Sequence, residues 1–242
     1  MVNFMSSRLQ ELFQMLRTPQ VAVSLMEGAV HGKDAFYAGV TEDFYHEAMR
    51  RHPRLVLIRR LQYGVALCRL PPDFDTYFMM VEAAARRNFK KAQRNGYSVR
   101  RIAFNDYLAD IAEIRASTEF RQGVMPGAYL AGAVTPCDNT PPMTATHDYP
   151  YWGILKDGKL VAYAGVMVAG EAAMIEHILG HAAYQGDGVV PLLIIGMAGD
   201  IMKQYPAVKY YGYGSYFGAG ETMRRFKRKF CFIPSHVKWV LG

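Results

Sequence analysis

The sequence predicts an α+β protein in which a central mixed, mostly antiparallel sheet is flanked by helices on both faces. Apolar residues make up 51% of the 242 residues, which is enough to bury a sizeable core. Runs with strand character and runs with helical periodicity both occur along the chain. The clearest signal lies between residues 151 and 179, where Asp157-Gly158 and a second turn near Gly170 separate three consecutive antiparallel strands.

The chain contains no internal repeat and no linker, so we expect a single domain over residues 1–242. Its N-terminal part, 1–75, is expected to hold a helix and strands, and its core is expected to span 76–242. No stretch approaches twenty uninterrupted apolar residues, and the N-terminus lacks the pattern of a secretory signal. We therefore expect a cytoplasmic protein without transmembrane association.

Hydrophobic spacing predicts the elements of the N-terminal part. Apolar residues at i, i+3, i+4 and i+7 indicate an amphipathic helix over residues 6–18. A strand is expected at 21–25. Residues 55–70 are expected to form a hairpin that turns near 62–64, because a glycine interrupts two apolar runs there.

The helices of the core are predicted from caps and periodicity. Asp73 or Asp75 can cap a helix at about 76–95, and Gly96 supplies its left-handed stop. A further helix is expected at 106–117. Residues 121–150 are rich in Pro, Gly and Thr and predict a long loop. After the three strands we expect an apolar helix, a strand, a short basic helix and a last strand, at 191–205, 208–213, 218–229 and 232–241.

The positive charge of the chain is concentrated in two stretches. The formal net charge is +7, and residues 85–96 and 221–232 hold ten of the 28 cations but one of the 21 acids. An excess confined to two places indicates a polyanion, a phosphate group or an acidic surface as partner. The alternative is that each stretch is the solvated face of a helix.

The same two stretches carry a resemblance to a known family. Residues 86–100, R-R-N-F-K-K-A-Q-R-N-G-Y-S-V-R, resemble the stretch that opens the transferase domain of the Fem family of peptidoglycan-bridge aminoacyltransferases. Y-Y-G-Y-G at 210–214 and F-G-A-G-E-T-M-R-R-F-K-R-K-F at 217–230 resemble its closing strand, turn and F-K-x-x-F element. The order of elements from 151 onward is similar to the GNAT acyltransferase fold. The resemblance runs from about 80 to 240.

The resemblance implies a transferase that forms an amide bond. Fem-like enzymes take the acyl group from aminoacyl-tRNA, which would give the basic stretches a natural partner. They usually carry two such domains and this chain has room for one, so their pentapeptide-precursor substrate is not carried over. The acceptor would be an amine on a small molecule, a cell-envelope precursor or a protein N-terminus. Acyl-CoA is the alternative donor, and a non-catalytic nucleic-acid-binding protein is the alternative from another class.

The donor is expected to bind the basic stretches and a glycine loop. The GNAT carrier-binding signature, [RQ]-x-x-G-x-[GA], is matched at Gln185 and Gly188 and fails at Val190, where a bulky side chain would obstruct a pyrophosphate. No tightly bound cofactor is expected. The residues predicted to bind aminoacyl-tRNA or acyl-CoA are Gln185, Gly186, Gly188, Arg87, Lys90, Lys91, Arg94, Arg224, Arg225, Arg228 and Lys229.

Strand 172–179 carries the candidate bases. Strict alternation would place Glu176 on one face, with Met174 and Ile178, and His177 on the other. In GNAT enzymes this central strand borders the acyl group, so Glu176 is the first candidate for the general base and His177 the reserve. The alternative for each residue is a hydrogen bond within the core.

Four further residues are candidates for substrate contact. Lys227 is the lysine of the F-K-x-x-F element and could stabilise an oxyanion. Tyr213 and Tyr211 are candidates for a general acid or for stacking on an adenine. Arg121, at the start of the long loop, could pair with a carboxylate of the acceptor.

No metal is expected. His177 and His181 are four residues apart, which on a strand is about 13 Å and too far to share an ion. The three cysteines form no C-x-x-C pair, so neither a disulfide scaffold nor a zinc finger is indicated. Cys137 as a nucleophile and the G-x-G at 212–214 as a nucleotide loop are weak alternatives.

Overall fold

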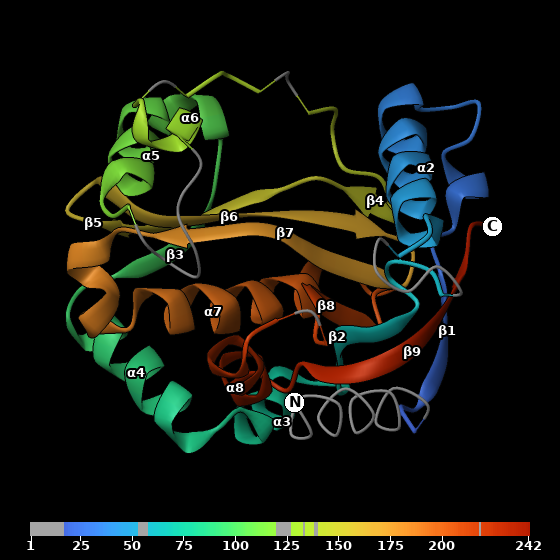
Figure 1. The fold of residues 1–242 in the computed structure, drawn as a ribbon. Coiled ribbons are helices and arrows are strands. Elements are labelled where there is room, and N and C mark those ends of the chain that lie inside the picture. The colour runs from blue at the N-terminus through green and yellow to red at the C-terminus, as the bar shows by residue number, and fades with distance from the viewer. Residues whose placement is uncertain (1–16, 53–57, 120–126, 133, 138–139, 218) are drawn as a thin grey trace, which may run out of the picture.

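The computed structural model places nine strands in one mixed sheet (Figure 1). It describes residues 17–52, 58–119, 127–132, 134–137, 140–217 and 219–242. The strand order is β1-β9-β2-β8-β7-β6-β5-β3, with β4 paired to β6 outside this path. The strands are β1 (Gln20–Ser24), β2 (Tyr63–Arg69), β3 (Ser98–Ile102), β4 (His147–Asp148), β5 (Tyr151–Lys156), β6 (Lys159–Ala169), β7 (Ala172–Gly180), β8 (Tyr210–Ser215) and β9 (Ile233–Val240).

Helices cover both faces of the sheet. In Figure 1, α2, α5 and α6 lie above it, and α3, α4, α7 and α8 lie below. The α-helices are α2 (Ala35–Met49), α3 (Phe74–Met80), α4 (Ala83–Arg94), α5 (Leu108–Ala116), α6 (Gly127–Leu130), α7 (Val189–Gln204) and α8 (Glu221–Lys229). Short 3₁₀ turns are η1 (Glu27–Ala29), η2 (Phe104–Tyr107) and η3 (Ala182–Asp187). The predicted fold class is confirmed, because β1–β9 and β7–β8 are the parallel pairs and the other pairs are antiparallel.

The three central strands form where the sequence predicts them. Asp157 and Gly158 both have positive φ, 51° and 83°, as a tight hairpin turn requires. Strands β5, β6 and β7 follow one another and pair antiparallel. Helix α7 packs beneath them and begins at Val189, two residues before the predicted start at Pro191. Its apolar side chains form the largest buried cluster with the lower face of the sheet.

Two predicted elements of the N-terminal half are wrong. Residues 55–57 of the predicted hairpin over 55–70 lie outside the described residues. Its second strand, β2, pairs with β8 on one edge and β9 on the other, and residues 59–62 make a turn, so the predicted pairing is wrong. The predicted helix at 76–95 is two helices, since Val81 and Glu82 are extended, with ψ of 138° and 137°. Val81 is buried, and the Glu82 N–H donates to the Lys229 carbonyl at 2.8 Å. These tertiary contacts stabilise the break between the two helices.

Other elements were not predicted or cannot be compared. The predicted helix at 6–18 lies almost wholly outside the described residues. Helix α2 was missed because its apolar residues do not form one stripe, although Asp34 caps it by accepting from the N–H groups of Phe36 and Tyr37. No helix in the described ranges is long and apolar enough to cross a membrane.

A buried carboxylate joins the upper loop to the sheet. Asp148 is 3% exposed and accepts hydrogen bonds from the Tyr205 hydroxyl at 2.5 Å, the Arg101 guanidinium at 2.7 Å and the Tyr149 N–H at 2.7 Å. These partners come from the end of α7, from β3 and from the segment that enters β5. A charge this deeply buried is tolerated because it is paired with Arg101 and accepts further hydrogen bonds.

We expect Asp148→Ala to lower the free energy of unfolding by about 2–4 kcal/mol, because it leaves Arg101 and Tyr205 without their acceptor. Urea denaturation measures the loss. Asp43→Ala, which removes an exposed carboxylate from α2, is the matched control and should change stability by less than about 0.5 kcal/mol. Equal effects of the two substitutions would contradict this role for Asp148.

Candidate functional site

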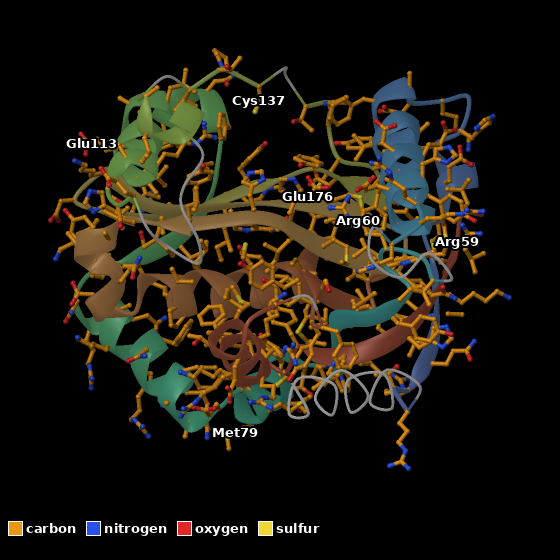
Figure 2. The ribbon with its side chains drawn as sticks, viewed as in Figure 1. Arg59, Arg60, Met79, Glu113, Cys137 and Glu176 are labelled. Atoms are coloured by element: carbon orange, nitrogen blue, oxygen red, sulfur yellow. The ribbon has the colours of Figure 1, made fainter. Side chains whose placement is uncertain are left out.

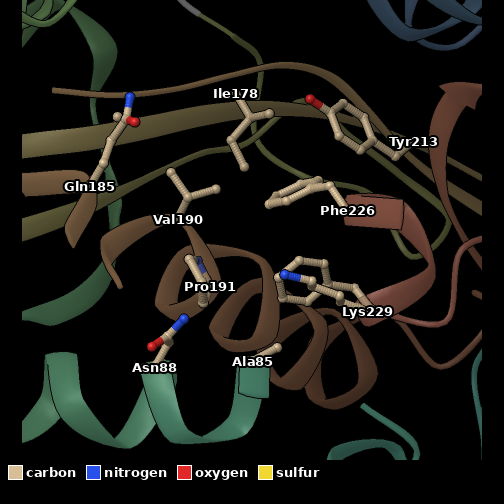
Figure 3. A pocket seen from close by; sticks show the side chains of 11 residues that line it. Ala85, Asn88, Ile178, Gln185, Val190, Pro191, Tyr213, Phe226 and Lys229 are labelled. Atoms are coloured by element: carbon tan, nitrogen blue, oxygen red, sulfur yellow. The ribbon is translucent and has the colours of Figure 1, made fainter. Parts of the chain in front are cut away.

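Strands β7 and β8 separate and leave a cavity beneath the sheet. They pair in parallel only from Ala172–Tyr210 to Met174–Gly212, and β7 continues to Gly180. Next to the unpaired part, a cavity of about 390 Å³ is lined from β7, β8, α7 and α8 (Figure 3). Among its lining side chains are Ile178, Tyr213, Gln185, Val190, Phe226 and Lys229.

Lys227 is buried behind the wall of this cavity. It is 5% exposed, its Nζ donates to the Ser215 carbonyl at 2.6 Å, and the Nζ lies 4.7 Å from the centre of the Tyr213 ring. Phe226 and Phe230 on the same helix line the cavity and hold α8 against the core. Burial lowers the pKa of Lys227 to about 8 and raises the pKa of Tyr213 to about 12. A cation that is poorly solvated and near a cavity can stabilise negative charge that develops there.

The glycine loop before α7 is fastened to α4. Gly188 has φ of 85°, and a Cβ there would lie 2.6 Å from the Asn88 carbonyl, so only glycine permits this approach. The Lys91 Nζ donates to the Gly186 carbonyl at 2.8 Å and lies 3.6 Å from the Asp187 carboxylate. The Tyr97 hydroxyl donates to Asp187 at 2.7 Å, and this bond together with Lys91 lowers the pKa of Asp187.

The two basic helices meet, but their cations have different surroundings. Lys229 lines the cavity, whereas Lys91 is used in the loop contact and Lys90 lies 5.8 Å from the centre of the Phe78 ring. Two cations of α8, Arg224 and Arg228, line a second, more open hollow with Tyr216 and Glu221. The side chains of Arg87, Arg94 and Arg225 are exposed, and their role in binding stays a prediction.

A β-bulge changes the expected faces of β7. Gly165 of β6 pairs with His177 and Val166 pairs with Ile175, so Glu176 is an extra residue in the strand. Ile175 and Ile178 therefore both pack into the lower cluster around α7. The prediction that Glu176 shares a face with Ile178 and lies opposite His177 is wrong.

Glu176 and His177 instead both contact the upper tyrosines. The Tyr149 hydroxyl donates to the Glu176 carboxylate, and the His177 ring centre lies 5.6 Å from that of Tyr151. Figure 2 shows Glu176 on the face of the sheet that carries α2 and α5. Gly165 is required beside the imidazole, because a Cβ there would lie 2.6 Å from the His177 ring.

The environment sets the protonation of both candidate bases. Desolvation by the surrounding protein raises the pKa of Glu176, and the hydrogen bond from Tyr149 offsets part of that rise. Burial, together with the nearby charge of Arg115, lowers the pKa of His177 to about 4. At neutral pH this face of β7 therefore presents a neutral imidazole and a carboxylate of increased basicity, and both can accept a proton.

This chain resembles solved structures in its fold. The structure of FemX superposes with a TM-score of 0.55 at 9% sequence identity, over 74% of this chain and 60% of the FemX chain. The chain has a GNAT-type, Fem-like fold. Two weaker matches are a C-terminal domain assigned to a lysylphosphatidylglycerol synthetase of Agrobacterium fabrum and L-PGS from Bacillus licheniformis. The first has a TM-score of 0.46 and 18% sequence identity, over 72% of this chain and 58% of the matched chain. The second has a TM-score of 0.45 and 14% sequence identity, over 72% of this chain and 57% of the matched chain.

The GNAT-type fold is thus confirmed, and the likeness extends to part of each matched protein. The chain spans 57–60% of the length of these three solved structures. A scan against protein-family models and a search of curated protein sequences each gave no match.

Within the GNAT-type fold, one predicted residue does not face a substrate site. Tyr211 is fully buried, and its hydroxyl donates to the Ile194 carbonyl at 3.3 Å, so the predicted substrate contact is corrected to a core hydrogen bond. His181 caps η3 by accepting from the Ala183 N–H at 3.2 Å. Arg121 lies outside the described residues.

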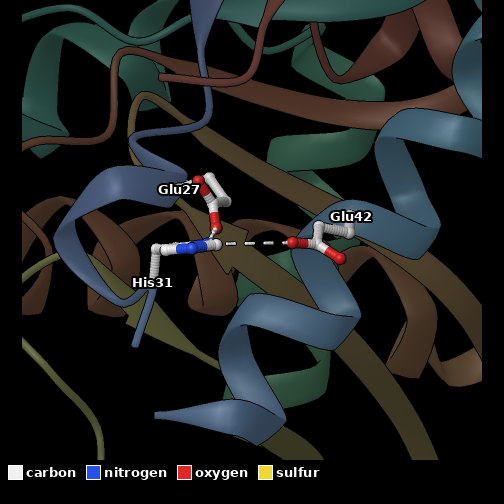
Figure 4. Close-up of side chains that lie close together, drawn as sticks. All are labelled: Glu27, His31 and Glu42. Atoms are coloured by element: carbon white, nitrogen blue, oxygen red, sulfur yellow. Dashed lines mark hydrogen bonds and ion pairs between the residues drawn. The ribbon is translucent and has the colours of Figure 1, made fainter. Parts of the chain in front are cut away.

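Three residues that the sequence did not single out could together hold a cation. The ligand atoms of Glu27, His31 and Glu42 lie within 4.8 Å of one another (Figure 4). His31 Nδ1 is 2.6 Å from Glu27 Oε1, a hydrogen-bonding contact at i, i+4 that needs no metal to explain it. This cluster lies on η1 and α2, away from β7.

Cys137 occupies a fixed position above the upper face. Its N–H and its carbonyl each bond to the Asn105 side chain at 2.9 Å, and its Sγ lies 3.5 Å from the Tyr151 hydroxyl.

Tyr149 and Tyr151 were missed because sixteen tyrosines dilute any signal from one of them. The repeated Tyr-x-Tyr directly before a strand was the available clue.

The lowered pKa of His177 predicts a pH-dependent stability. In the folded state the His177 imidazole is protonated only near pH 4, whereas in the unfolded chain it is protonated near pH 6.5. The contribution of the neutral imidazole to the free energy of unfolding is therefore complete above about pH 6.5 and is lost as the pH falls towards 4. We expect His177→Gln to lose less free energy of unfolding between pH 7 and pH 5 than the wild type does. His46→Gln, at an exposed position on α2, should retain the wild-type slope.

Proposed function

We propose that this protein is an amide-forming acyltransferase that moves an aminoacyl group from aminoacyl-tRNA to an amine. The observation that carries the proposal is the buried Lys227 beside a cavity that opens where β7 and β8 part. In this mechanism the amine nitrogen attacks the ester carbonyl carbon, negative charge develops on the carbonyl oxygen, and the bond to the ribose oxygen breaks as that oxygen takes up a proton.

Each half of this reaction has side chains available. The Lys227 ammonium, over the ring of Tyr213, provides positive charge at the cavity wall for the developing oxyanion. On the upper face, Glu176 and His177 can accept the proton that the amine loses as it attacks. The unpaired end of β7 lies between the two, so donor and acceptor would meet through the gap in the sheet.

The loop before α7 favours tRNA over acyl-CoA as donor. A pyrophosphate at this loop would meet the Asp187 carboxylate, which Tyr97 and Lys91 keep ionised, and the Val190 side chain, which lines the cavity. Lys91 is also engaged there, with the Gly186 carbonyl. Several cations of α4 and α8 remain exposed, and an extended polyanion such as tRNA can use them without entering the loop.

We expect Lys227→Met to lower the rate of transfer from a charged tRNA by about 100-fold, because the cation for the oxyanion is lost. The binding of the same tRNA should change by less than about threefold. In the wild type, kcat/KM should fall as the pH rises through about 8, where Lys227 loses its proton, whereas in Lys227→Arg that fall should be absent. Lys203→Met, at the exposed end of α7, is the matched control. Transfer that survives in Lys227→Met would reject the role of Lys227, whereas tRNA binding by the wild type without any transfer would favour a non-catalytic nucleic-acid-binding role.

The donor is tested by salt dependence. The logarithm of the tRNA association constant should fall linearly with the logarithm of salt concentration, and Arg87→Gln with Arg94→Gln should reduce that slope by roughly 1.5, since each neutralised phosphate contributes about 0.7–0.9. Acetyl-CoA at saturating concentration should leave the melting temperature unchanged. A clear thermal shift with a coenzyme A thioester, or tRNA binding that is indifferent to salt, would assign the donor site to acyl-CoA instead.

A further inference from the structure

A third group of cations lies outside both basic stretches, on the turn between α2 and β2. Arg50 and Arg51 follow α2, and Arg59 and Arg60 precede β2. The backbone of Arg51 bridges to that of Arg59, and the Arg60 N–H donates to the Arg50 carbonyl at 2.8 Å. Two short antiparallel segments thus bring four arginines into one small surface, which we call the arginine turn.

Acidic partners are present on only one side of the arginine turn. Glu47 lies 3.6 Å from Arg50 and also pairs with Arg60. Arg51 and Arg59 are exposed and have no acidic partner among the described residues. Residues directly opposite each other in an antiparallel pair have Cβ atoms about 4.5–5.5 Å apart, and like charges in that position destabilise the pair. An anion bound between the two guanidinium groups would remove this repulsion.

The arginine turn adjoins the upper face of the sheet. Met49 and Leu61, which flank it, pack on the same buried cluster as Tyr149, and Tyr149 donates to Glu176. Figure 2 shows Arg59 and Arg60 on the side of the sheet where Glu176 is exposed. The basic helices α4 and α8 lie on the opposite face (Figure 1). Both helices contribute residues to the lining of the cavity. An anion at the arginine turn would therefore lie on the face of the sheet that carries Glu176, whereas the cavity lies on the other face.

We propose that Arg51 and Arg59 bind a phosphate ester group carried by the amine acceptor. The assignment of the phosphate ester to the acceptor rests on the function proposed above, whereas the binding of a phosphate ester rests on the arginine turn alone. Guanidinium groups bind phosphate oxygens in a bidentate fork, and two such groups side by side match a phosphate better than a single carboxylate. The phosphate ester is either part of a soluble metabolite or the headgroup of a phospholipid.

The test compares two double variants that each remove two charges. Arg51→Gln with Arg59→Gln alters the arginine turn, and Arg100→Gln with Lys203→Gln alters exposed sites on β3 and α7 as the matched control. Soluble binding is measured with glycerol phosphate by calorimetry, and membrane binding by flotation with phosphatidic acid in phosphatidylcholine vesicles against phosphatidylcholine alone. We expect one of the two probes to bind the wild type, the arginine-turn variant to bind it about tenfold or more weakly, and the control to stay within about twofold.

The variants also separate this inference from the proposed function. Because the arginine turn lies on the acceptor side, Arg51→Gln with Arg59→Gln should bind charged tRNA as the wild type does. If the wild type shows no transfer from charged tRNA while the arginine-turn variant loses phosphate binding, the transferase proposal fails and the phosphate site stands. No saturable binding of either probe by the wild type, or an equal loss in the control variant, would overturn the inference.

Discussion

The site depends on the different lengths over which β7 pairs with its two neighbours. Against β6 it is paired from Ala172 to Gly180, but against β8 it is paired only to Met174. The bulge at Glu176 lies just beyond the point where the second pairing stops. The sheet is therefore parted between β7 and β8 beyond Met174, and β7 contributes Ile178 to the cavity and Glu176 to the other face. Lys227, the glycine loop and the upper tyrosines are all positioned relative to this strand.

Most of the fold was predictable from local patterns. The turn at Asp157-Gly158, the apolar run of α7 and the basic periodicity of α8 each correspond to a described element, because propensity and burial agree there. The segments that failed are those where tertiary contacts override the local signal. Residues 76–95 read as one helix, but the contact of Glu82 with Lys229, far along the chain, divides them.

The site was predicted less completely, for physical reasons that particular residues make clear. Glu176 and His177 were identified as candidates, but a bulge has no signature in the alternation of β7, so their relative placement was wrong. The burial of Lys227 follows from the aromatic side chains that flank it in the sequence, whereas that of Asp148 depends on partners from β3 and α7. The arginine turn escaped attention because its residues are split between two segments whose pairing is not local.

The topology of the sheet also constrains how the chain acquires its structure during synthesis. Strand β2 pairs with β8 and β9, and β1 pairs with β9, so in the described sheet the first two strands have no partner until the last two have been made. Contacts between such distant segments form slowly, because a long loop must close before they are gained. Until β8 and β9 are made, the hydrogen-bonding edges of β1 and β2 lack the strand partners that they have in the described sheet. Unpaired strand edges of this kind are sites of aggregation during synthesis.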